Sequence, residues 1–256
     1  MKTVAIFQHD QTQGPGYLRE FLDRRDIPYE IFHPAEGDAV PTNPLDHSGL
    51  VFLGSNQSVN DGLSWIEAEL QLIRTALRSD RPVLGHCFGG QLLARALGAS
   101  VMSNPHPHIG WGRVMTTAYT DSREWFGEAG AFNAFHWHYQ SFTLPAGARR
   151  VLYGQHSLNK GFSAGKHLGL QCHLEITEAT LRSWCAAGAG EISQNAGDTV
   201  ENIATIFERL PQKLAALHRV ADRVYSHWTE GLVRPARIMT AINGWQPERQ
   251  LAFIRH

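Results

Sequence analysis

Residues 81–91 read Arg81-Pro82-Val83-Leu84-Gly85-His86-Cys87-Phe88-Gly89-Gly90-Gln91. In this stretch an apolar strand runs directly into the pattern Gly-x-Cys-x-Gly, and the apolar spacing of a helix follows. The turn around Cys87 is so tight that the positions on either side tolerate only small residues, which explains Gly85 and Gly89. The segment therefore predicts a nucleophile elbow in which a cysteine sulfur takes the place of the serine oxygen.

An elbow of this kind would give Cys87 the surroundings of a nucleophile. Its sulfur would lie at the N-terminus of the following helix, where free N–H groups and the positive end of the helix dipole favour a thiolate. The backbone N–H of Phe88 would point to the place where an oxyanion forms. Because a buried, inert cysteine in a tight turn has the same pattern, a catalytic Cys87 also requires a base.

A candidate base lies far downstream, in Leu168-Gly169-Leu170-Gln171-Cys172-His173-Leu174-Glu175. A strand would deliver His173 at its end, and Glu175 follows two residues later. At this spacing a carboxylate can orient the imidazole and stabilise its protonated form, which completes a Cys–His–Glu triad. A surface histidine after a strand is the alternative, since the chain contains 14 histidines.

Outward from the elbow, short apolar strands alternate with stretches of helical period. The strands are expected at 4–7, 29–32, 50–53 and 82–85, and helices around 18–22, 63–77 and 91–97. This alternation predicts an α/β fold with a mainly parallel central sheet that is covered on both faces. Strands and turns predominate afterwards, with candidate strands at 112–117, 151–155 and 168–172.

The C-terminal part of the chain differs from the rest. An apolar stripe of helical spacing, ending at Gly231, consists of Leu214, Leu217, Val220, Val224 and Trp228. We interpret it as one of a pair of helices packed on the core rather than as a partner-binding helix. The sequence therefore predicts an α/β domain over residues 1–190 and a helical C-terminal extension over residues 191–256.

The composition excludes several classes of protein. The 256 residues are 43% hydrophobic and 18% charged, which is enough for a packed core and excludes a disordered chain. The 23 Lys and Arg residues and 24 Asp and Glu residues nearly cancel, so no basic excess favours binding to nucleic acid. The first apolar run, Val4–Phe7, is too short for a signal peptide or a membrane span. Three cysteines form no disulfide or zinc framework. We expect a cytoplasmic protein without nucleic-acid or membrane partners.

Two pairs of histidines deserve comparison with metal sites. The patterns His106-x-His108 and His136-x-His138 would each place two imidazoles on one face of an extended segment. No third ligand at a fitting spacing accompanies either pair. We therefore expect neither a metal nor any other cofactor.

Several motifs in order resemble the class I (triad) glutamine amidotransferase family, in its subgroup of free-standing domains similar to the glutaminase part of GMP synthase. The resemblance runs from about Met1 to Leu181. The segments that carry it are 50–61, 81–91, 97–99, 109–114, 137–138, 144–148 and 171–175.

This resemblance implies a three-layer α/β/α sandwich of the flavodoxin-like type. It also implies that Cys87 is the nucleophile and that His173 and Glu175 complete the triad. The reaction would be hydrolysis of the γ-amide of glutamine or of a γ-glutamyl compound through a glutamyl thioester.

The resemblance further implies how the substrate is held. The oxyanion would be bound by the Phe88 N–H and by a backbone N–H at Gly54 or Ser55. Further residues would line the pocket for the α-amino and carboxylate ends of the glutamyl group, namely Gln91, His138, Tyr139 and Gln140.

The chain departs from the family pattern at three places. Cys172 and Leu174 flank His173 where relatives have Phe and Pro, and His108 stands where relatives often have Glu. The sequence His138-Tyr139-Gln140 stands where they tend to have His-Gly-Asp. The loss of two carboxylates weakens selection for a free α-ammonium, so the pocket need not accept free glutamine.

Three functions therefore stay open. The chain could be a glutaminase subunit that passes ammonia to a separate synthetase, since no nucleotide-binding pattern is recognised after the α/β part. It could be a stand-alone hydrolase of γ-glutamyl peptides or amides. It could also be a non-catalytic binding protein that keeps the fold.

Overall fold

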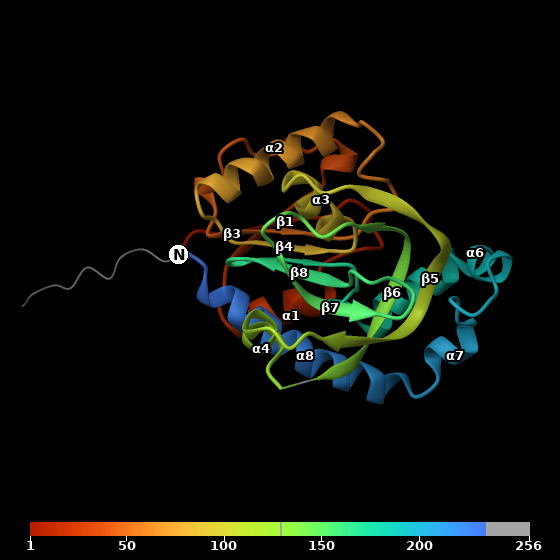
Figure 1. Cartoon of the computed structure of the whole chain (residues 1–256). Coiled ribbons are helices and arrows are strands. Elements are labelled where there is room, and N and C mark those ends of the chain that lie inside the picture. The colour runs from red at the N-terminus through yellow and green to blue at the C-terminus, as the bar shows by residue number, and fades with distance from the viewer. Residues whose placement is uncertain (129, 234–256) are drawn as a thin grey trace, which may run out of the picture.

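The computed structural model describes residues 1–128 and 130–233, which are built around one central sheet (Figure 1). Within these residues the sheet has nine strands in the order β2-β1-β3-β4-β9-β8-β7-β5-β6. The strands are β1 (Val4–Phe7), β2 (Tyr29–Phe32), β3 (Gly49–Phe52), β4 (Val83–His86), β5 (Val101–Thr116), β6 (Ala131–Phe142), β7 (Arg149–Gly154), β8 (Gly161–Ala164) and β9 (His167–Leu170).

The half of the sheet that carries the elbow is parallel. Strands β2, β1, β3, β4 and β9 pair in parallel in this order. Every residue of β1, β3, β4 and β9 is buried, as expected for short parallel strands with helices on both faces. The α/β fold predicted from the alternating pattern is confirmed, and the strands at 4–7 and 29–32 begin and end where the sequence placed them.

The other half of the sheet is antiparallel. The pairs β9·β8, β8·β7, β7·β5 and β5·β6 all run in opposite directions, so the expected parallel pairing ends at β9. The candidate strand at 112–117 is the last part of the long strand β5, which shifts register against β6 between Ser103 and His108. Strands β6 and β8 were not predicted, although residues 135–140 of β6 alternate aromatic and polar side chains as a strand does; the four residues of β8 are too few to show a period.

Helices cover both faces of the sheet and complete three layers. In Figure 1, α2 (Ser64–Arg78) and α3 (Phe88–Ala96) lie on one side, and α1 (Gly16–Arg24), α4 (Thr120–Phe126) and α8 (Leu210–Glu230) lie on the other. Successive residues of a strand point to opposite faces. Ala5 and Phe7 of β1 accordingly join one apolar cluster, while Val4 and Ile6 join the other.

The remaining helices are short and lie around one end of the sheet (Figure 1). They are α5 (Glu178–Ala187), α6 (Ala189–Gln194) and α7 (Ile203–Phe207), and the 3-10 turns η1 (Pro34–Glu36) and η2 (Pro44–Asp46) connect β2 to β3. The side chain of Thr177 caps α5 by accepting a hydrogen bond from the Thr180 N–H.

The predicted C-terminal stripe lies on α8, which ends at Gly231 as expected. Trp228 is fully buried, and its ring and the Leu232 side chain pack on Gly49 of β3, where a Cβ would overlap Leu232 and crowd the indole. The last 23 residues of the predicted extension, 234–256, lie outside the described residues. The division at residue 190 stays a prediction.

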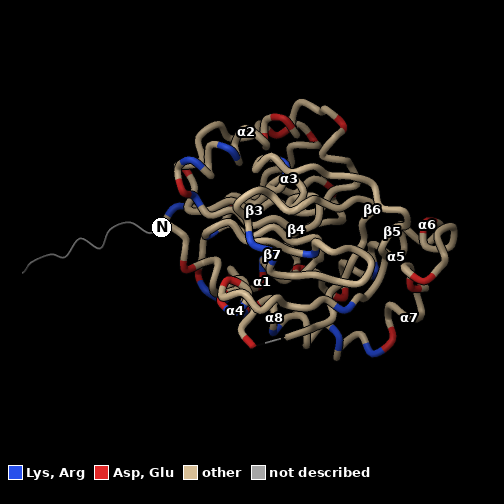
Figure 2. Tube along the Cα trace, in the orientation of Figure 1, with Lys and Arg blue, Asp and Glu red and all other residues tan. Residues whose placement is uncertain are grey.

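Charged residues lie mainly on the helices and loops, where both signs occur close together (Figure 2). In the part of the chain that the structure describes, no helix is both long enough and apolar enough to cross a membrane.

Two glycines let α3 lie very close to the sheet. A Cβ on Gly89 would overlap the carbonyl group of Phe52, and a Cβ on Gly90 would overlap the backbone of Leu170. In the same contact the Gly89 N–H donates a hydrogen bond of 3.1 Å to the Leu53 carbonyl. The position of the elbow therefore depends on two residues without side chains.

We predict that Gly89→Ala lowers the free energy of unfolding by about 2–3 kcal/mol, because the backbone of β3 must move to accept the new methyl group. Gly190→Ala is the matched control, since nothing lies within 4 Å of a Cβ at this helical position. Urea denaturation of both variants checks the prediction. Equal stability of the two would show that α3 does not need the close approach.

Candidate active site

The elbow forms between β4 and α3, with Cys87 in a strained conformation. Its backbone angles are φ 51° and ψ −107°, in the positive-φ half of the Ramachandran map that a residue with a Cβ rarely adopts. The Cys87 N–H donates a hydrogen bond of 2.8 Å to the Leu170 carbonyl of β9. A Cβ on Gly85 would overlap the backbone of Gly89, so the turn closes only with glycine at this position.

The structure brings the three residues of the predicted triad together. His173 follows β9, and its Nδ1 lies 2.5 Å from Oε1 of Glu175. Cys87 lies close enough to His173 for its charge to raise the pKa of the imidazole, and the Cys87 sulfur donates to the Trp137 carbonyl at 3.7 Å. The edge of the ring contacts the Trp184 indole at a centroid distance of 4.9 Å. The order carboxylate–imidazole–sulfur is the one that nucleophilic catalysis by cysteine requires.

Charge in this buried site favours an imidazolium. Burial by itself lowers the pKa of His173, but the charges of Glu175 and Cys87 and the hydrogen bonds to them outweigh it and raise the pKa to about 10. Burial likewise raises the pKa of Glu175, yet His86 and His173 outweigh it and lower the pKa to about 2. At neutral pH the pair is therefore a carboxylate and a protonated ring.

A second imidazole, which sequence reasoning did not single out, lies against the same carboxylate. Nδ1 of His86 is 3.1 Å from Oε2 of Glu175. Its Nε2 lies 3.5 Å from the Tyr225 hydroxyl of α8. Burial lowers the pKa of His86, although Glu175 opposes this effect. The only sequence signal was its position directly before Cys87 in the elbow.

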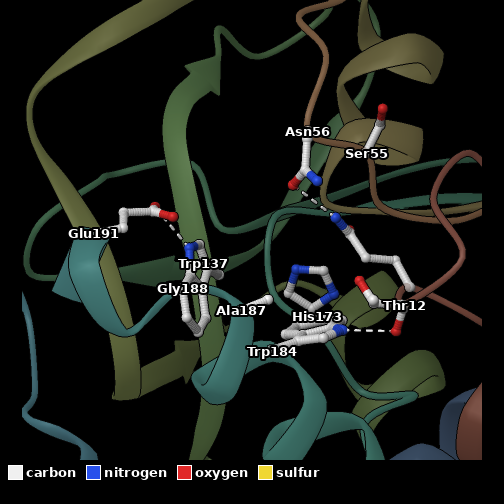
Figure 3. A pocket seen from close by; sticks show the side chains of 10 residues that line it. Thr12, Ser55, Asn56, Trp137, His173, Trp184, Ala187, Gly188 and Glu191 are labelled. Atoms are coloured by element: carbon white, nitrogen blue, oxygen red, sulfur yellow. Dashed lines mark hydrogen bonds between the residues drawn. The ribbon is translucent and has the colours of Figure 1, made fainter.

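A cavity of about 200 Å³ lies beside His173 (Figure 3). Two indoles form its apolar walls, and both are fixed by hydrogen bonds: Trp184 Nε1 donates to the Thr12 carbonyl at 2.7 Å, and Trp137 Nε1 donates to Glu191 at 2.8 Å. The residues that line it are Thr12, Gln13, Ser55, Asn56, Trp137, His173, Trp184, Ala187, Gly188 and Glu191. Of the predicted site residues, Ser55 and His173 are in this set.

The three residues predicted to supply oxyanion donors lie near the triad. A Cβ on Gly54 would stand 3.1 Å from Cε1 of His173 and displace the end of the Gln13 side chain, so Gly54 lies directly against the imidazole. Phe88 is the first residue of α3, and its N–H therefore has no partner within the helix. In residues 1–128 and 130–233, the Ser55 N–H donates no hydrogen bond.

The other predicted pocket residues do not line the cavity. Gln91 donates hydrogen bonds to the Gln140 carbonyl at 3.1 Å and to Gln171 Oε1 at 3.3 Å. Gln140 accepts a hydrogen bond of 2.8 Å from Ser58, and Tyr139 is 44% exposed. Gln171, which sequence reasoning did not single out, has its Nε2 at 3.8 Å from the Cys87 sulfur.

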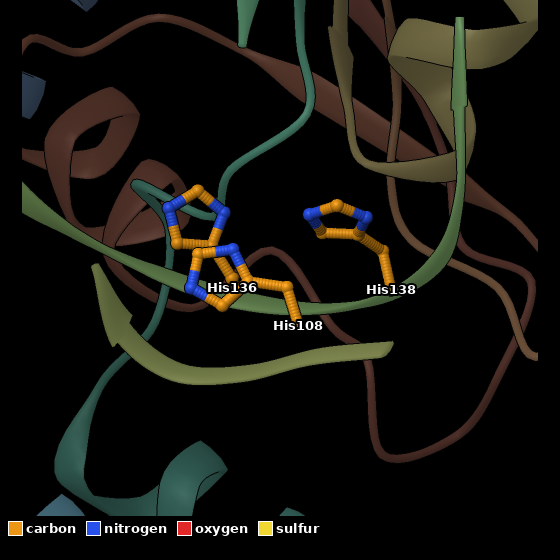
Figure 4. A group of neighbouring side chains, drawn as sticks. All are labelled: His108, His136 and His138. Carbon is orange, nitrogen blue, oxygen red and sulfur yellow. The ribbon is translucent and has the colours of Figure 1, made fainter. Parts of the chain in front are cut away.

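The side chain of His138 instead belongs to a histidine cluster (Figure 4). His108, His136 and His138 are buried, and one nitrogen of each lies within 4.8 Å of the others. His108 faces His138 across the β5·β6 ladder, so the two sequence patterns contribute to one cluster. The expectation that no third imidazole would join a pair was wrong, because the sequence does not show the register of two long strands.

Lys160 supplies the positive charge in this cluster. Its Nζ lies 3.0 Å from His108 Nδ1 and 3.3 Å from His138 Nε2, and the residue is 1% exposed. Burial lowers the pKa of Lys160 to about 8, so the ammonium persists at neutral pH. Burial and the charge of Lys160 lower the pKa of His108 to about 3. A divalent ion would compete with this ammonium for the same lone pairs, and we therefore interpret the hydrogen bonds of Lys160 to His108 and His138 as a support of β5 and β6. Among the described residues, neither ring nitrogen of His136 has a hydrogen-bond partner.

Comparison with known proteins extends this picture. A model of the family "Glutamine amidotransferase class-I" matches residues 18–183. A solved structure of a glutamine amido transferase from Methylobacillus flagellatus is 36% identical, with a TM-score of 0.90, and covers 93% of this chain and 98% of its own. A glutamine amidotransferase from Thermotoga maritima is 25% identical, with a TM-score of 0.81, and covers 90% and 98%.

A longer relative is a glutamine-hydrolysing GMP synthase from Aeropyrum pernix. It is 27% identical over 178 residues, which are 66% of this chain and 32% of the synthase. Because the family model matches more than half of the sequence, this chain belongs to the class-I glutamine amidotransferase family.

Proposed function

We propose that the chain is a cysteine-dependent amide hydrolase that acts on the γ-carboxamide of glutamine or of a γ-glutamyl compound. The observation that carries this proposal is the buried imidazole of His173, which pairs with Glu175 and lies close enough to Cys87 for its charge to raise the pKa of the ring. The cavity beside His173 supports it, since a substrate needs access to the reacting groups. Membership of the family supports the same class of reaction.

In this mechanism the Cys87 thiolate attacks the γ-carbonyl carbon, and the carbonyl oxygen becomes an oxyanion. His173 holds the proton that came from the thiol and gives it to the leaving ammonia or amine, which breaks the C–N bond. A γ-glutamyl thioester is left on Cys87. Water, deprotonated by His173, then attacks the thioester, releases glutamate and restores the thiol. Glu175 stabilises the imidazolium in both steps.

The oxyanion would be bound by the Phe88 N–H and by a second N–H at Gly54 or Ser55. Both are backbone donors, so they need little reorganisation when charge develops. One such donor is worth roughly 10²–10³ in rate.

Two uses of the reaction differ in their leaving group. The similarity to a GMP synthase supports a glutaminase that passes ammonia to a separate synthetase. The indoles of Trp137 and Trp184 in the cavity favour the second candidate, a stand-alone γ-glutamyl hydrolase, because apolar walls beside His173 could hold an organic amine.

We predict that Cys87→Ala lowers the release of ammonia or amine from the preferred substrate by roughly 10³-fold or more, because the nucleophile is lost. A panel of glutamine and γ-glutamyl peptides and amides identifies that substrate. Cys185→Ala, a buried cysteine on α5, is the matched control and should keep wild-type activity. Equal release by wild type and Cys87→Ala would contradict the hydrolase and favour a non-catalytic binding protein.

The ion pair makes a second prediction, about pH. Because the pKa of His173 is raised from 6.5 to about 10, its contribution to stability is complete below pH 6.5 and is lost as the pH rises through about 10. The pKa of Glu175 is lowered from 4.5 to about 2, so its contribution is present above pH 4.5 and is lost as the pH falls through about 2. The pair should therefore stay intact throughout the neutral range.

Glu175→Gln should move the titration of His173 to lower pH, because the carboxylate that holds the proton is gone. The NMR shift of the His173 ring, followed from pH 5 to pH 10, measures this change. Glu178→Gln is the control, since this glutamate is half exposed and pairs with Arg182 on α5. An unchanged His173 titration in Glu175→Gln would show that Glu175 does not hold the imidazolium.

A further inference from the structure

A second buried histidine–carboxylate pair lies next to the elbow. His9 follows β1, and its Nε2 lies 2.9 Å and 3.1 Å from the two carboxylate oxygens of Glu69 on α2. The side chains of both residues are fully buried. The other ring nitrogen, Nδ1, lies 3.2 Å from the carbonyl oxygen of Gly54, at the end of the neighbouring strand β3. The pair therefore joins α2 to the loop beside the triad.

The partners of His9 determine where its protons lie. A carbonyl oxygen only accepts, so Nδ1 of His9 carries a hydrogen and donates it to Gly54. If Glu69 is ionised, Nε2 also carries a hydrogen and the ring is an imidazolium. Burial raises the pKa of Glu69, and a protonated Glu69 would instead donate to Nε2. In both cases the Nδ1–H stays directed at the Gly54 carbonyl.

When the direction of the Gly54 carbonyl is fixed, the direction of the Ser55 N–H is fixed as well. The carbonyl of Gly54 and the N–H of Ser55 belong to one planar peptide group, and in a trans peptide they point in opposite directions. A hydrogen bond from His9 on one side therefore directs the Ser55 N–H to the other side. In the described part of the chain this N–H has no acceptor, although Ser55 lines the cavity beside His173.

The ring of His9 also supports the other candidate donor. Its edge meets the Phe88 ring at a centroid distance of 4.9 Å, and its face stacks on Trp65 at 5.3 Å. Phe88 carries the N–H at the start of α3. One imidazole thus contacts both segments that would bind an oxyanion.

We propose that His9 and Glu69 are positioning residues that orient the Ser55 N–H as the second oxyanion donor, opposite the Phe88 N–H. The inference rests on the proposed function, and it selects Ser55 over Gly54 as the source of that donor. Neither His9 nor Glu69 would touch the substrate. Their effect would pass through the peptide group between Gly54 and Ser55.

The test compares variants that separate the hydrogen bond from the packing of the ring. The double variant His9→Phe/Glu69→Met keeps an aromatic ring against Phe88 and Trp65, removes the donor, and leaves no buried carboxylate without a partner. His9→Asn lacks the ring, but its side-chain N–H can take the place of Nδ1–H. Glu69→Gln retains a hydrogen-bond partner for Nε2. Urea denaturation first establishes that each variant is folded.

We expect kcat of the double variant to fall roughly 10–100-fold, since a misdirected donor loses part of the 10²–10³ that such a group contributes. KM should change little, because the oxyanion exists only in the transition state. His9→Asn should restore most of kcat, and Glu69→Gln should stay close to wild type. A double variant with wild-type kcat, or an equal loss in His9→Asn, would overturn the inference.

A second measurement does not depend on turnover. The ¹H–¹⁵N NMR signal of the Ser55 amide should move in the double variant and return towards its wild-type position in His9→Asn. If Cys87→Ala releases as much ammonia as wild type, the proposed function fails, and this signal alone then decides whether His9 orients the peptide. A Ser55 signal unchanged in the double variant would overturn the inference, whether or not the chain is a hydrolase.

Discussion

The strained backbone of Cys87 is the constraint on which the rest of the site depends. A non-glycine residue in this conformation costs about 1–3 kcal/mol and persists only where its surroundings hold it. Here the Leu170 carbonyl fixes the Cys87 N–H, and the glycines at 85 and 89 let β4 and α3 close around it. The same turn places the sulfur at the helix N-terminus and against His173. The backbone conformation of Cys87 therefore determines both how β4 and α3 pack together and where the sulfur lies.

Because the ionisable groups around this turn are buried, their charges interact strongly with one another. Glu175 lies between the rings of His173 and His86, and both imidazoles help to keep it ionised inside the protein. Through His86 this network reaches the Tyr225 hydroxyl on α8. The C-terminal helix, which the sequence indicated only as an amphipathic stripe, thus lies next to the triad carboxylate. A buried polar network of this kind is stabilising only when its members find partners.

One residue type has three different roles in this chain, and the neighbours decide which. His173 lies between a carboxylate and a sulfur, which favours its protonated form. His9 lies between Glu69 and a backbone carbonyl, so it acts as a fixed donor. His108 is buried beside the Lys160 ammonium, and burial first and this charge second lower its pKa and keep it a neutral hydrogen-bond acceptor. In the proposed function the first of these histidines is a base and the second a positioning group, while the third supports β5 and β6.

The sequence by itself determined the α/β class, the elbow at Cys87 and the pairing of His173 with Glu175, because each follows from local spacing. A tight turn demands glycines nearby, and a separation of two residues brings a carboxylate to an imidazole. Only the tertiary structure decided that His138 turns towards Lys160, that β6 joins β5 in a long antiparallel pair, and that His9 meets Glu69. These contacts join residues distant in the chain, and strand register and helix packing, which leave no local signal, set their partners.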